Sequence, residues 1–134
     1  MNARKGMPRI KESDLQANIV EWMRYALPID AYVHHSPNEG KRGPKARADL
    51  VRMGCLKGFP DLLILWNRKA YFLEVKAPGG TLTLEQRHLL ESLDGLGYRT
   101  AVVNSIEIAE AYLRGWGIPL RSRPMPVREA ANNG

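Results

Sequence analysis

Two short apolar segments joined by a tight turn constrain the fold of this chain more than any other feature. Residues 58–65 and 70–76 are each rich in strand-forming residues, and only four residues separate them. This spacing predicts an antiparallel hairpin with a two-residue turn at 67–68. In that register Asp61 lies directly opposite Glu74, so the turn alone brings two acidic side chains together.

The two carboxylates create an electrostatic problem that the fold must solve. Directly opposed side chains in a hairpin have Cβ atoms roughly 5 Å apart, and two half-buried negative charges at that distance repel. A divalent cation with oxygen ligands, or a proton shared between the carboxylates, would neutralise the pair. Lys76 projects from the same face of the strand as Glu74. Two carboxylates for a metal ion and a neighbouring ammonium suit phosphodiester hydrolysis.

The residues of this hairpin resemble a nuclease motif. Pro60-Asp61 followed by Glu74-Val75-Lys76 resembles the PD-(D/E)XK superfamily. The Gly-Phe before the proline, the Gly-rich exit from the second strand and the glutamine that follows are similar to stand-alone, phage-type members of its VRR-NUC branch. The resemblance implies an α/β fold with a mixed β-sheet flanked by helices, as in restriction endonucleases, in the order αβ(α)ββαβα.

The resemblance also implies a metal-dependent activity and a role for the site residues. It implies a Mg²⁺-dependent endodeoxyribonuclease, with Mn²⁺ as a substitute, that acts as a homodimer on branched DNA such as a Holliday junction. Asp61, Glu74 and the backbone carbonyl of Val75 would bind the metal ion. Lys76 would position the attacking water and stabilise the developing charge.

Two further residues each have a functional and a structural interpretation. Glu12 matches by position the glutamate on the first helix that often completes the metal site in this superfamily, but the helix dipole also favours an acid at a helix start. Gln86 would support Lys76 in the family interpretation, but it also stands at the third helical position of a capping box that begins at Thr83.

The charge distribution indicates an anionic partner. The chain has a net charge of +6 and a pI of about 9.7, and nucleic acid is the partner that fits best. Six basic residues and one acid lie between positions 41 and 57, immediately before Asp61. We expect DNA contacts from these six residues and from an arginine on a later helix: Lys41, Arg42, Lys45, Arg47, Arg52, Lys57 and Arg87.

Periodicity and end signals predict the remaining elements. A first helix is expected over 13–27, with a capping box from Ser13 to Gln16. The other expected elements are a strand over 31–36, a helix over 44–53, a helix opened by Thr83, a buried strand over 98–104 and a helix over 106–113. The expected boundaries are a flexible basic arm over 1–11, a nuclease domain over 12–117 and a flexible tail over 118–134.

Composition excludes several classes of protein. Cys55 is the single cysteine, so no internal disulfide can form, as expected in the cytoplasm, or in the host cytoplasm if the chain is phage-encoded. No segment approaches the roughly 20 apolar residues of a membrane span, and no small-molecule cofactor is expected. The alternative function is a non-catalytic nucleic-acid-binding module. In another alternative, Asp61 and Glu74 form a purely structural network with Lys69 and Lys76.

Overall fold

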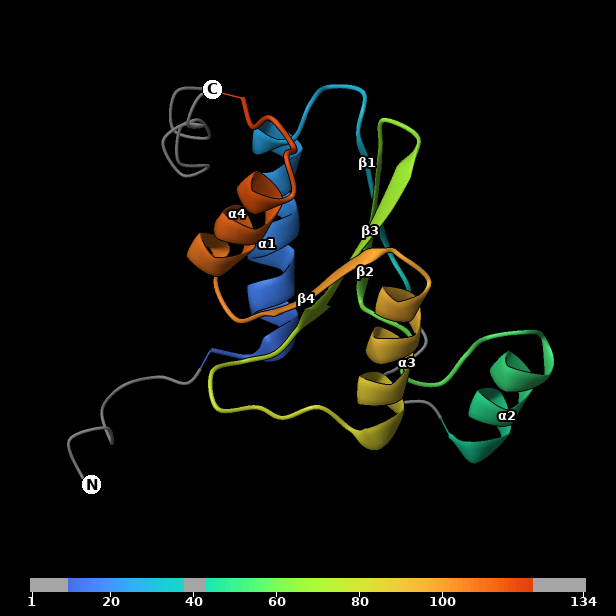
Figure 1. Cartoon of the computed structure of the whole chain (residues 1–134). Helices are drawn as coiled ribbons and strands as arrows, with labels where there is room; N and C mark the ends of the chain where they lie inside the picture. Colours follow the sequence, from blue (N-terminus) through green and yellow to red (C-terminus); the bar gives the residue numbers. More distant parts are fainter. Residues whose placement is uncertain (1–9, 38–42, 122–134) are drawn as a thin grey trace, which may run out of the picture.

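The computed structural model describes residues 10–37 and 43–121. Within these ranges no helix is long and apolar enough to cross a membrane. The element order αβ(α)ββαβα is confirmed (Figure 1). The elements are α1 (Glu12–Ala26), β1 (Tyr32–His35), α2 (Pro44–Arg52), β2 (Leu62–Trp66), β3 (Lys69–Val75), α3 (Leu84–Gly95), β4 (Arg99–Val103) and α4 (Ile106–Gly115).

The predicted hairpin forms the middle of a four-stranded sheet with the strand order β1-β2-β3-β4. β2 pairs antiparallel with β3, and the register places Trp66 opposite Lys69 and Leu62 opposite Leu73, as expected. Asn67 and Arg68 have φ angles of 54° and 64°, the positive values that a type I′ turn requires at both central positions. β1 pairs antiparallel with β2, and β4 pairs parallel with β3 after the crossover through α3.

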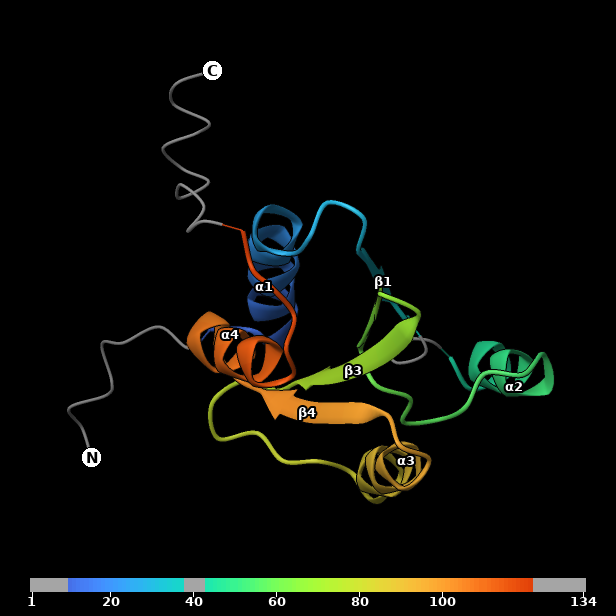
Figure 2. The ribbon, with the colours of Figure 1, turned by 45° about the horizontal axis from the view of Figure 1, so that its top comes forward.

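Helices cover the two faces of this sheet unequally. α1 and α4 pack together on one face, whereas α3 lies on the opposite face beside β4 (Figure 2). α2 stands apart from the sheet, and none of its residues is buried (Figures 1 and 2). On the α3 face Tyr32 and Leu65 remain exposed, so α3 leaves the β1–β2 half of that face open. The core lies between the sheet and the α1–α4 layer and includes Ile19, Met23, Leu62, Ile64, Leu73 and Leu113.

The first helix begins earlier than predicted. α1 starts at Glu12, and its N-cap residue makes no side-chain capping bond. The predicted capping box between Ser13 and Gln16 is therefore wrong, because Ser13 already lies inside the first turn. Acidic side chains in that turn offset the positive end of the helix dipole instead. Gln16 is directed to the sheet, where its Nε2 lies 3.0 Å from Nδ1 of His35.

The last strand is less buried than predicted. Ala101 and Val103 are buried against the α1–α4 layer, but Val102 between them is 38% exposed. β4 is an edge strand, and α3 covers its outer face only in part. Its apolar run therefore reflects strand propensity more than burial on both faces.

The folded domain also extends beyond the predicted boundary at residue 117. Ile118 is buried in the core, and the Arg121 guanidinium donates hydrogen bonds to the carbonyls of Leu27 and Arg24 at 2.7 and 2.6 Å. Residues 118–121 thus cap the end of α1 instead of belonging to a flexible tail. Residues 122–134 and residues 1–9 of the expected arm lie outside the described residues.

Candidate active site

Asp61 enters the site from the turn that leads into β2. It follows the fully buried Pro60 and directly precedes Leu62, the first residue of β2. Its carboxylate accepts a hydrogen bond from the backbone N–H of Val75, with 2.8 Å between Oδ2 and the nitrogen. This bond holds Asp61, which is only 6% exposed, against the strand that carries Glu74.

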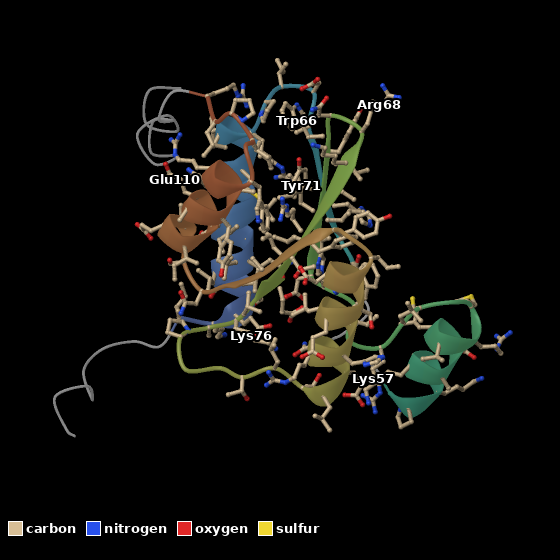
Figure 3. All side chains as sticks on the ribbon, in the orientation of Figure 1. Lys57, Trp66, Arg68, Tyr71, Lys76 and Glu110 are labelled. Carbon is tan, nitrogen blue, oxygen red and sulfur yellow. The ribbon has the colours of Figure 1, made fainter. Side chains whose placement is uncertain are left out.

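Glu74 is a buried carboxylate with unsatisfied oxygen atoms. Its side chain is 1% exposed, and neither Oε1 nor Oε2 has a hydrogen-bond partner among the residues of the described ranges. The Nζ of Lys76 lies 3.5 Å from Oε2, which is an ion pair too long for a strong hydrogen bond. Figure 3 shows Lys76 at the opposite end of the sheet from Trp66 and away from Tyr71. Buried acceptors without donors are rare, so these two oxygens need an explanation.

The electrostatics of the pair agree with this geometry. Burial and the negative charge of Asp61 together raise the pKa of Glu74 to about 8, although the ammonium of Lys76 opposes the change. Burial also raises the pKa of Asp61, whereas the hydrogen bond from Val75 and the positive charge of Lys76 oppose this change. One ammonium therefore does not compensate two buried carboxylates, and a further positive charge would stabilise the site.

The first turn of α3 packs on the loop that delivers Asp61. Gly58 in that loop has a φ of +83°, and a Cβ atom built on it would lie 2.8 Å from the backbone nitrogen of Gln86. The predicted capping box is present: Thr83 Oγ1 accepts from Gln86 N–H, and Gln86 Oε1 accepts from Thr83 N–H. The structural interpretation of Gln86 is thus confirmed. Gln86 is 5% exposed, and its Oε1 is occupied by the cap.

His35 is a neighbour of the site to which the sequence reasoning assigned no role. Its Nδ1 lies 3.0 Å from the carbonyl oxygen of Asp61, which also accepts a hydrogen bond from the N–H of Ser36 at 2.9 Å. Nδ1 can donate to Asp61 or accept from Gln16, depending on the tautomer. The pairing of β1 with β2 creates this contact, because His35 lies opposite Leu62. The contact of His35 with Asp61 could have been predicted only from the register in which β1 pairs with β2.

Comparison with known proteins identifies the family. The model of the VRR-NUC domain family matches residues 10–107. The chain belongs to the VRR-NUC domain family. A solved structure described as a VRR_NUC domain protein is 27% identical, covers 80% of this chain and 91% of its own, and superposes with a TM-score of 0.63. No curated protein matches the sequence. VRR-NUC domains are generally nucleases, and this family agrees with the arrangement of Asp61, Glu74 and Lys76.

Three of the residues predicted for the site lie together in the structure, and Glu12 is not grouped with them. Asp61, Glu74 and Lys76 converge at one end of the hairpin. Glu12 is an exposed residue at the start of α1, and within the described ranges no three His, Cys, Asp or Glu side chains form a group that could hold a metal ion. The role of Glu12 stays a prediction. Lys69 lies at the opposite end of β3 from Glu74, which rules it out of a structural network with the two acids.

The predicted DNA-contacting residues are distributed over two helices and the loop after α2. Lys41 and Arg42 lie outside the described residues. The side chains of Lys45 and Arg52 make ion pairs of 4.0 and 3.5 Å with Asp49, and Lys57 lies 3.8 Å from Glu85 of α3. The five predicted DNA-contacting residues that the structure describes are all exposed: Lys45, Arg47, Arg52, Lys57 and Arg87.

Proposed function

We propose that this VRR-NUC domain is a divalent-metal-dependent endonuclease that hydrolyses phosphodiester bonds in DNA, with branched or junction DNA as its substrate and a homodimer as its active form. The observation that carries the proposal is the pair of unsatisfied oxygens of Glu74, which lie buried beside a second carboxylate and one ammonium. A site that only bound DNA would gain nothing from two acids where a phosphate must approach.

The donor atoms of the site fit a hard divalent cation. Asp61, Glu74 and the backbone carbonyl of Val75 would hold Mg²⁺ or Mn²⁺ through oxygen, and Glu12 would add a further carboxylate. Such an ion supplies Lewis acidity and lowers the pKa of bound water. Its charge would also satisfy the orphaned oxygens of Glu74, which no described residue does.

The residues of the chain would then orient the substrate and stabilise charge. Lys76 is 13% exposed, so its ammonium is partly desolvated and held near Glu74. From there it would orient the attacking water and stabilise negative charge on the phosphate oxygens. Gln86 would support Lys76 through its amide nitrogen, since its oxygen is engaged in the cap. The exposed basic residues of α2 and α3 would contact phosphates along the DNA backbone.

The test compares labelled junction, flap, duplex and single-stranded DNA, each incubated with Mg²⁺, with Mn²⁺ and with a chelator. We expect cleavage only with metal, fastest on branched substrates, and a loss of about 100-fold or more in Lys76→Ala with DNA binding retained. Lys69→Ala is the matched control, because it removes an exposed lysine from the far end of the same strand. Sedimentation would report the expected homodimer.

Either of two results would contradict the assignment. Cleavage that persists in chelator would exclude metal dependence. Cleavage by Lys76→Ala at the wild-type rate would show that the chemistry lies elsewhere. Metal-dependent cleavage of plain duplex at the rate of the junction would leave a nuclease but remove the selectivity for branched DNA.

A further inference from the structure

A cavity lies beside the candidate active site, between β1 and the segment that joins α2 to β2. It has a volume of about 390 Å³. Its walls are mainly apolar, with an aromatic ring, a histidine and a serine among them, and include His34, Ser36, Leu50, Cys55, Leu56 and Phe59. The described active-site carboxylates do not line it. The cavity is therefore a second feature next to the reaction centre, and it is not part of the metal site.

Two residues of its wall connect the cavity directly to Asp61. Phe59 precedes Asp61 by two residues, which is a reach of at most about 7 Å along the chain. Ser36 donates its backbone N–H to the carbonyl of Asp61 at 2.9 Å. A group bound against Phe59 or Ser36 would consequently lie close to the candidate site.

The cavity also opens on the face of the sheet that carries Glu74. His34 lies opposite Leu63, and Leu63 lies opposite Phe72, so these three residues form one row across the sheet. Phe72 is two residues before Glu74 and shares its face of β3. The ring of Phe59 contacts that of Phe72 edge to face, with 5.7 Å between centroids. This aromatic pair thus joins the wall of the cavity to the face of β3 that carries Glu74.

Exposed basic side chains lie on the same segments as two of the wall residues, since α2 supplies Leu50 and Lys57 directly follows Leu56. Lys45 and Arg52 of α2 and Lys57 after it have side-chain exposures of 92%, 74% and 74%. Asp49 of α2 makes ion pairs with Lys45 and Arg52, and Glu85 of α3 makes one with Lys57, so the three basic residues outnumber their two acidic partners. An apolar hollow on a segment that also carries exposed cations is complementary to a nucleotide, whose base is flat and apolar on its faces and whose phosphates are anionic.

We propose that this cavity binds the base of an unpaired nucleotide next to the phosphate that is cut. The inference rests on the proposed nuclease function and explains how that function would select its substrate. A base within a duplex is stacked and paired and cannot enter the cavity, whereas a base at a branch point can be splayed out. Phe59 offers an aromatic face or edge, and His34 and Ser36 offer hydrogen-bonding groups for the edge of the base.

Binding in chelator tests the inference without any need for cleavage. The probes are a blunt fluorescent duplex and the same duplex with a single-stranded arm, measured by fluorescence anisotropy. We expect His34→Ala to weaken binding of the armed duplex about tenfold and to leave binding of the blunt duplex unchanged. Tyr32→Ala is the matched control, because Tyr32 is an exposed residue on the same face of the same strand and does not line the cavity.

Cys55 supplies a second readout that requires no substitution. It is the single cysteine of the chain and lines the cavity, so alkylation by a small thiol reagent reports on access to this site alone. A single-stranded oligonucleotide should slow the alkylation, and a blunt duplex at the same concentration should not.

The outcomes separate this inference from the proposed function. Equal losses for His34→Ala and Tyr32→Ala, or alkylation that neither DNA slows, would overturn the cavity as a base-binding site even if the protein cuts DNA. Alkylation that slows with protein concentration alone would overturn it in favour of a second copy of the chain. Arm-dependent binding that is lost in His34→Ala but kept in Tyr32→Ala, by a protein that cuts nothing, would support the cavity and refute the nuclease.

Discussion

We expect the buried carboxylate of Glu74 to make the metal-free protein less stable as the pH rises. Burial raises the pKa of Glu74 from 4.5 to about 8 in the folded state, whereas the unfolded chain keeps the ordinary value. Between these two values the unfolded state loses its proton and the folded state does not. The free energy of unfolding should therefore fall from about pH 4.5 to about pH 8 and then level off.

The size of this loss of stability follows from the shift in the pKa of Glu74. The interval from 4.5 to about 8 covers about 3.5 pH units, and each unit corresponds to about 1.4 kcal/mol, so the maximal loss is about 5 kcal/mol. Glu74→Gln removes the titrating group and nearly preserves its shape. In chelator we expect this variant to be more stable than wild type at pH 8, by a few kcal/mol, and nearly equal to it at pH 5.

The assay is urea unfolding at several pH values between 5 and 8, in chelator and with Mn²⁺. Glu21→Gln, which changes an exposed glutamate on α1, is the control and should follow wild type. Mn²⁺ should stabilise wild type more at pH 8 than at pH 5, because the metal competes with the proton, and it should barely stabilise Glu74→Gln. A wild-type stability that is flat from pH 5 to 8 in chelator, or a slope unchanged in Glu74→Gln, would refute the reasoning.

Three further substitutions test the scaffold around the site. Gly58→Ala should lower the free energy of unfolding by about 2–4 kcal/mol and lower nuclease activity, because the new Cβ would lie 2.8 Å from the backbone of α3 and the φ of residue 58 is +83°. Wild-type stability in thermal unfolding would contradict the contact. Arg68→Gly should raise the free energy of unfolding by about 0.5–1 kcal/mol, because relief of the positive φ of 64° in the hairpin turn outweighs the entropy cost of glycine. A lower melting temperature would argue against the type I′ turn. Arg121→Ala should cost about 2–3 kcal/mol with the kcat of cleavage unchanged, because two charge-assisted bonds to the end of α1 are lost; a cost below about 0.5 kcal/mol would remove its role as a cap.

The sequence predicted the site where local rules determine the geometry. A two-residue turn fixes the register of a hairpin, and the register then decides which residues oppose each other. Asp61, Glu74 and Lys76 follow from that turn and from strand alternation alone. The capping box of α3 was equally local, since Thr83 and Gln86 are three residues apart.

The features that sequence reasoning missed depend on contacts between distant residues. Arg121 bonds to Leu27, 94 positions away, and no local pattern near residue 118 reveals that the chain continues on the domain. His35 meets the carbonyl of Asp61, 26 positions away, only because β1 joins the hairpin edge in one register. Such pairings are determined by tertiary packing, which propensities and caps do not encode.

The unsatisfied oxygens of Glu74 favour the proposed catalytic interpretation of the acidic pair over the structural one. A structural network stabilises a fold when each buried charge is paired and hydrogen-bonded, and a half-satisfied network is worse than apolar packing. Here the ammonium of Lys76 faces two buried carboxylates, and Glu74 keeps both oxygens without a hydrogen-bond donor in the described part of the chain. If Glu74 had only a structural role, an apolar residue at this position would give a more stable fold. The arrangement is costly to the metal-free protein and would be relieved by a bound cation, so substitutions at this position that lower metal affinity should raise the stability measured in chelator.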